Sequence, residues 1–102
     1  METREPGYCE TSSGQRQHVG MKPLNGTNYE LMNANINTKR LEEECLAECR
    51  NYPRSTGCEI VWGHARRGCY VHTMEVKRGS GAQKGYQHMC WIFSHLGEFC
   101  LG

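Results

Sequence analysis

The sequence lacks any long hydrophobic run, since its longest apolar stretch is only a few residues. A membrane-spanning helix needs about 20 consecutive, mostly apolar residues, so we expect no membrane insertion. Phenylalanine is scarce as well, with two in 102 residues, and only 37% of the residues are hydrophobic. A chain of this length forms one domain, and its apolar core is expected to be small.

An excess of charge of one sign is also missing. Twelve Lys and Arg residues stand against 11 Asp and Glu residues, and they are spread along the chain. Nucleic-acid binding usually requires a basic stripe or patch, so no nucleic-acid partner is expected. The chain also lacks the HExxH, GxSxG and glycine-rich phosphate-binding motifs of common enzymes. We therefore expect no catalysis and no cofactor.

Cysteine is what the chain has in quantity. Seven in 102 residues approach the density of a disulfide scaffold. Such bridges stabilise a domain with a small core by restricting its unfolded chain, and they form in oxidising compartments. The polar opening, residues 1–6, has no apolar segment of the kind that a signal peptide carries. Either the chain is a mature fragment with an added Met, or the protein stays in the cytosol. The cysteine content favours a secreted or extracellular fragment of a larger or processed protein.

One segment carries a clear helical pattern. Thr38 is a good N-cap for a helix over residues 39–50, and Pro53 prevents that helix from continuing. Three residues recur every four positions and so share one face: Leu41, Cys45 and Cys49. This face is predicted to be buried.

Alternating apolar residues predict a hairpin and one further strong strand. The hairpin strands cover residues 58–62 and 69–73 around a glycine-bounded turn, and the last strand covers residues 88–93. Weaker patterns indicate short strands near residues 8–10 and within residues 19–31, where a proline and an Asn-Gly turn signal interrupt the chain. In the hairpin, Cys58 and Cys69 both fall on the face assigned to the core.

These positions favour one pairing of the central cysteines. Cys45 and Cys49 project in parallel from one helix, so a bond between them is strained, and each is expected to reach the hairpin. The nested pairs Cys49–Cys58 and Cys45–Cys69 are preferred, although four cysteines allow three connectivities and the sequence alone does not decide.

Three cysteines remain outside the helix and hairpin. A bridge between Cys9 and Cys90 is expected to join the first and last strands. Cys100 is then left over, and three alternatives stay open for it: it competes with Cys90 for Cys9, it links two chains into a dimer, or it is free in a monomer.

This arrangement resembles the PAN/apple family. The likeness is carried by Leu41-Glu-Glu-Glu-Cys-Leu-Ala-Glu-Cys49, Gly57-Cys-Glu-Ile-Val-Trp62 and Gly68-Cys-Tyr-Val-His72, together with an outer pair of cysteines. The resemblance implies an α+β fold in which one helix packs on a curved, four- to five-stranded antiparallel sheet and disulfides hold the two together. The likeness runs from about Cys9 to Phe93, so the module is assigned to residues 7–94. The polar residues 1–6 are expected to be a disordered start, and residues 95–102 a tail without a clear element. Cys100 departs from the six-cysteine pattern of the family.

The hairpin tip is one candidate binding surface. Arg66 and Arg67 can form bidentate bonds to carboxylate or sulfate. Tyr70 and His72 lie on the strand face opposite the cysteines, so we expect them to be exposed, and aromatic and Arg side chains are frequent binding anchors. The alternative is an ordinary solvated turn with half-buried aromatic residues.

The glycine-rich segment 79–85 is the second candidate surface. Lys77, Arg78 and Lys84 flank it and are able to attract sulfate or carboxylate groups, although a plain flexible connector is the alternative. Asn25-Gly26-Thr27 is a glycosylation sequon. Zinc is not expected, because the chain has no Cys-x-x-Cys knuckle.

Together these features favour an extracellular adhesion or recognition module that binds a protein or a glycan. Two other functions fit the same sequence: a stand-alone secreted carbohydrate-binding protein, and a structural domain that dimerises through Cys100. The PAN/apple resemblance implies the first, because members of that family are extracellular modules that bind proteins or carbohydrates.

Overall fold

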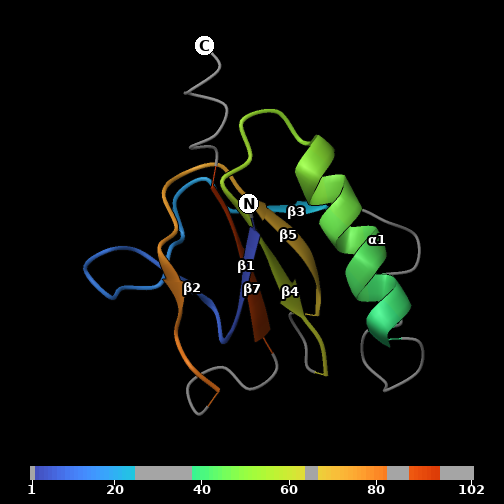
Figure 1. Ribbon diagram of the computed structural model, residues 1–102, viewed down its shortest axis with the longest axis horizontal. Coiled ribbons are helices and arrows are strands. Elements are labelled where there is room, and N and C mark those ends of the chain that lie inside the picture. Colours follow the sequence, from blue (N-terminus) through green and yellow to red (C-terminus); the bar gives the residue numbers. More distant parts are fainter. Residues whose placement is uncertain (1, 25–37, 64–66, 83–87, 95–102) are drawn as a thin grey trace.

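The computed structural model describes residues 2–24, 38–63, 67–82 and 88–94, and it has three layers (Figure 1). The single described helix, α1 (Thr38–Asn51), covers one face of a five-stranded antiparallel sheet. The sheet has the order β1 (Glu2–Pro6), β7 (His88–Phe93), β4 (Gly57–Val61), β5 (Gly68–His72) and β3 (Lys22–Leu24). A two-stranded ribbon, β2 (Cys9–Glu10) with β6 (Arg78–Gly79), lies on its other side.

The helix lies where its sequence pattern predicts it. It begins at Thr38 and extends to Asn51, one residue beyond the expected end and still ahead of Pro53. The side chains that recur every four positions are buried, as predicted: Leu41, Cys45 and Cys49 are each at most 3% exposed. No helix among the described residues is both long and apolar enough to cross a membrane.

The main core lies between this helix and the sheet. The predicted alternation in the hairpin is confirmed, because β4 and β5 contribute Cys58, Ile60, Cys69 and Val71 to the same buried cluster as the helix. Trp62 and Trp91 pack against the edge of this cluster and remain partly exposed.

Three disulfides connect the layers. Cys45–Cys69 and Cys49–Cys58 join α1 to β5 and β4, and Cys9–Cys90 joins the ribbon to β7. These are the three pairs favoured from the sequence. The outer bridge differs in its setting, because Cys9 belongs to the ribbon and not to the sheet that holds Cys90. Cys100 and the tail lie outside the described residues.

The expectation of a disordered start is wrong for β1. All five residues of this strand pair with β7, from Glu2 opposite Phe93 to Pro6 opposite Met89. Ion pairs with α1 add to the backbone pairing, because Arg50 binds Glu2 and Arg4 binds Glu42 at 2.9 Å. An edge strand tolerates charged side chains and proline, so its polar sequence did not show the usual alternation.

A second, smaller core fills the space between the sheet and the ribbon. It consists of Cys9, Val76 and Cys90, with Ile92 packed against it. Gly57 makes this close approach possible, because a Cβ there would lie 2.7 Å from both Val76 Cγ2 and the Trp91 carbonyl oxygen. The sheet is therefore covered on both faces, and the segment expected to be a glycine-rich loop begins inside strand β6.

The bridges differ widely in the length of chain that they close, which gives a testable difference in stability. The chain-entropy relation assigns about 4.5 kcal/mol to Cys9–Cys90, with a separation of 81 residues, and about 2.6 kcal/mol to Cys49–Cys58, with a separation of 9. We expect the double variant Cys9→Ala/Cys90→Ala to lose more unfolding free energy in urea denaturation than Cys49→Ala/Cys58→Ala. Equal losses, or a larger loss for the shorter loop, would contradict this expectation.

Candidate functional site

A fully buried carboxylate occupies the centre of the sheet face that the ribbon covers. Glu59, in the middle of β4, is 0% exposed. Its paired neighbours are Tyr70 on β5 and Cys90 on β7. Because side chains alternate along a strand, His72 and His88 lie diagonally next to Glu59 on the same face, within reach of a long side chain.

Four nitrogen donors surround this carboxylate. Oε1 accepts hydrogen bonds from His72 Nε2 at 3.0 Å and from the Cys9 backbone N–H at 3.1 Å. Oε2 accepts one from His88 Nδ1 at 2.9 Å and lies 3.5 Å from Arg16 Nη2. An ionised carboxylate only accepts hydrogen bonds, so we assign the hydrogen of each imidazole to the nitrogen that faces Glu59.

These contacts determine the protonation state of the buried group. Burial raises the pKa of Glu59, but the hydrogen bonds from His72, His88 and the Cys9 backbone outweigh it and lower the pKa from 4.5 to about 2. Glu59 is therefore ionised at neutral pH in spite of its burial.

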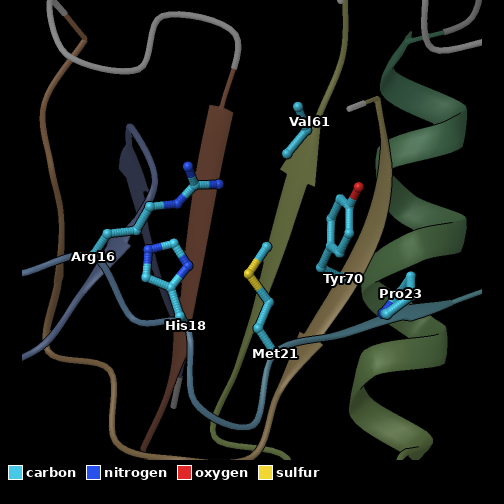
Figure 2. A pocket seen from close by; sticks show the side chains of 6 residues that line it. All are labelled: Arg16, His18, Met21, Pro23, Val61 and Tyr70. Atoms are coloured by element: carbon cyan, nitrogen blue, oxygen red, sulfur yellow. The ribbon is translucent and has the colours of Figure 1, made fainter. Parts of the chain in front are cut away.

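A cavity opens beside this buried cluster (Figure 2). It has a volume of about 320 Å³ and is lined by residues from four neighbouring segments: Arg16, His18, Met21, Pro23, Val61 and Tyr70. Figure 2 shows Arg16 and His18 on one side, Tyr70 on the other, and Met21 between them in front of β4. We call this cavity the Arg16 pocket.

Arg16 links the pocket to the buried cluster. Its guanidinium group contacts Glu59 and lies over the Tyr8 ring, 5.2 Å from the ring centroid, so the side chain is held from two directions. Its side chain is nevertheless 24% exposed, although its Nε is buried and has no hydrogen-bond partner among the described residues. A guanidinium carries five N–H donors, four of them on the two Nη atoms, so Arg16 retains Nη donors for an acidic group in the pocket.

Of the binding residues predicted at the hairpin, one lines this pocket and two others do not. Tyr70 lines it, as a candidate binding residue should. The expected exposure of His72 is wrong: this residue is 0% exposed, because the ribbon covers the sheet face that the sequence left open to solvent. Arg67 is partly buried and is not among the described residues that line the pocket.

The second predicted surface lies apart from the pocket lining. Lys77 is 3.9 Å from Glu75, and Arg78 donates a hydrogen bond to Glu10 at 3.0 Å. The other candidates, Asn25, Arg66 and Lys84, lie outside the described residues.

Arg16, His18 and Glu59 were not predicted from the sequence. One feature of the sequence could have pointed to Glu59. It is the only carboxylate in the strand at 58–62, and the two other strong strands each carry a histidine. No local pattern marks Arg16, because its contact with Glu59 spans 43 positions and depends on the complete fold.

Two groups of side chains have spacing compatible with metal ligation: Cys45, Cys49, Cys58 and Cys69, and Cys9 with Glu59 and His72. Within each group the ligand atoms lie within 4.8 Å of one another. Every cysteine in both groups belongs to a disulfide, however, and the thiolate is the form that binds metal. In this oxidised state neither group offers a thiolate.

Removing the buried charge should destabilise the protein strongly. Glu59→Gln is expected to lower the unfolding free energy at neutral pH by about 3–5 kcal/mol, because the amide cannot accept from all the donors that face it. Glu75→Gln, at an exposed side chain, is the control and is expected to change it by less than about 0.5 kcal/mol. Denaturation in urea measures both, and similar effects of the two substitutions would contradict the role of Glu59.

Glu59 also makes the stability of the protein depend on pH. The pKa of Glu59 in the folded state, about 2, is below the ordinary 4.5. Its contribution to the unfolding free energy is therefore complete above about pH 5 and is lost as the pH falls toward 2. The stability difference between the wild type and Glu59→Gln should therefore narrow by about 3 kcal/mol over that range. A constant difference between pH 7 and pH 2 would refute this.

Comparison of the chain with protein-family models, curated proteins and solved structures finds no match in any of the three. The likeness to PAN/apple modules therefore remains a resemblance of cysteine and strand motifs. What the chain binds has to be inferred from the chemistry of its own residues.

Proposed function

We propose that this chain is an extracellular recognition module that binds a protein or glycan partner through an acidic group of that partner, without catalysis. One observation carries the proposal: a partly exposed guanidinium is held at the edge of a pocket by a buried carboxylate. Because Glu59 and the Tyr8 ring already fix Arg16, a ligand that binds there does not have to order a free side chain.

The lining of the pocket supports an acidic ligand that also has an apolar part. Arg16 and His18 provide nitrogen donors, whereas Met21, Pro23 and Val61 provide apolar surface. Tyr70 provides an aromatic ring. A few placed polar groups on a mostly apolar lining are typical of small-molecule and side-chain binding sites. A carboxylate or sulfate carried on a sugar ring or a peptide fits this composition.

The disulfides support the extracellular setting. All six cysteines among the described residues are bonded in pairs, which is typical of proteins from oxidising compartments. The same bonds leave no thiol nucleophile among these residues. The PAN/apple resemblance leads to the same expectation of a binding module.

The experiment is a binding measurement with acidic probes. We expect sialic acid, glucuronate or a sulfated glycan, on an array and then by calorimetry, to bind the wild-type chain. Arg16→Gln should weaken this binding at least about tenfold, which corresponds to about 1.4 kcal/mol and is in the range for one charge-assisted hydrogen bond. An array of acidic peptides forms the second arm and distinguishes a protein partner from a glycan partner.

Arg40→Gln is the matched control. It removes the same charge from a side chain that is 74% exposed on α1, on the other face of the sheet. Because Arg16→Gln also removes a donor from Glu59, binding is compared at a temperature at which circular dichroism shows both variants to be folded. Equal weakening by both would indicate a general charge effect, and the absence of binding in both arms would overturn the proposal.

A further inference from the structure

A second and larger hollow lies on the helix side of the sheet. Its volume is about 610 Å³, and the described residues that line it come from α1, β1, β7 and the end of β4: Arg4, Lys39, Glu42, Glu43, Leu46, Trp62 and Trp91. The four helix residues are spaced i, i+3, i+4 and i+7 and so share one face of α1. We call this hollow the tryptophan pocket.

Aromatic surface dominates its lining. Both tryptophans of the chain, Trp62 and Trp91, take part, together with the aliphatic side chain of Leu46. Both indoles pack against the main core and remain partly exposed. Each indole therefore keeps some accessible surface on a rigid support, although Arg4 lies over the ring of Trp91.

The charges around the tryptophan pocket cancel. Arg4 lies over the Trp91 ring, 5.6 Å from its centroid, and donates a hydrogen bond to Glu42 at 2.9 Å. The position that a cationic ligand would take over the indole is thus already occupied. Lys39 and Glu43 add one exposed charge of each sign. A strongly charged ligand of either sign meets a like charge here, which disfavours both.

We propose that the tryptophan pocket binds a neutral pyranose sugar. Such a ring has an apolar C–H face that can stack on the indole of Trp62, which no described cation covers, and hydroxyl groups that both donate and accept hydrogen bonds. Glu43 accepts from these hydroxyls and Lys39 donates to them. A purely apolar ligand would instead bury the charged groups at the rim without partners, which is unfavourable.

This inference goes beyond the proposed acidic-group binding and is independent of it. The Arg16 pocket is lined from the segments around β3 and β5, whereas the tryptophan pocket is lined from α1 and β1. No described residue lines both. Each site can therefore be tested with the other intact.

Tryptophan emission is a direct probe of the second site, because both tryptophans line it. Titration with galactose, glucose, mannose and N-acetylglucosamine should give a saturable change in emission with at least one sugar, at a Kd in the millimolar range. Chemical-shift changes of the two indole N–H signals provide a second readout. No saturable change with any of the four, up to about 50 mM and thus well above a millimolar Kd, would overturn the proposal.

Two substitutions locate the binding. Trp62→Ala removes one stacking surface, and Glu43→Ala removes one exposed acceptor without touching the core. Each should weaken sugar binding about tenfold, as expected for the loss of one aromatic or charge-assisted contact. Because Trp62→Ala also removes one fluorophore, calorimetry measures that variant.

Controls separate the two sites. Glu75→Ala, an equivalent loss of an exposed carboxylate away from the pocket, should leave sugar binding unchanged. Arg16→Gln should leave it unchanged as well, although it abolishes or weakens the binding of acidic ligands. If Glu43→Ala binds the sugar as tightly as Glu75→Ala does, the sugar binds elsewhere and the proposed site is wrong.

Discussion

The interaction on which the rest of the structure depends is the ring of donors around the Glu59 carboxylate. It brings together Cys9 of the ribbon, His72 of β5, His88 of β7 and Arg16 from the segment before β3. A buried carboxylate is tolerated only when its oxygens are satisfied, so these segments must all be in place at once. The bond from Cys9 holds the ribbon on the sheet, and the contact with Arg16 holds that side chain in the wall of the Arg16 pocket.

Local periodicity was enough to predict about half of the fold. The helix, the hairpin and the strand at 88–93 each show a repeat of 3.6 or 2 residues, and the buried faces that follow from these repeats place the central cysteines opposite one another. Strands β1 and β6 have no such signal, and β2 has only a weak one, because these strands are short, polar and stabilised by partners more than 60 positions away. Without the ribbon, one face of the sheet was expected to be exposed, and the burial of His72 was missed for this reason.

The candidate site was harder to predict than the fold. Tyr70, which lines the Arg16 pocket, could be named as a candidate because an aromatic residue on the non-cysteine face of a strand is visible in the pattern. Arg16 becomes a candidate only through its contact with a distant carboxylate. The two pockets also differ in their electrostatics. One presents a guanidinium with unused donors, and the other balances its charges around two indoles. Under the two proposals, the protein engages two chemically different parts of one partner, on opposite faces of one sheet.

The strand order has a consequence for the route to the folded state. The strand that comes last along the described chain, β7, lies inside the sheet between β1 and β4. Until residues 88–93 are available, β4 has an unpaired edge and Cys9 lacks its partner Cys90. During synthesis, therefore, the helix and the hairpin can assemble early through their short loops, whereas the sheet closes late and at a high entropic cost. In that interval Cys9 is open to bonding with another cysteine, and disulfide exchange is the reaction that can correct such a bond.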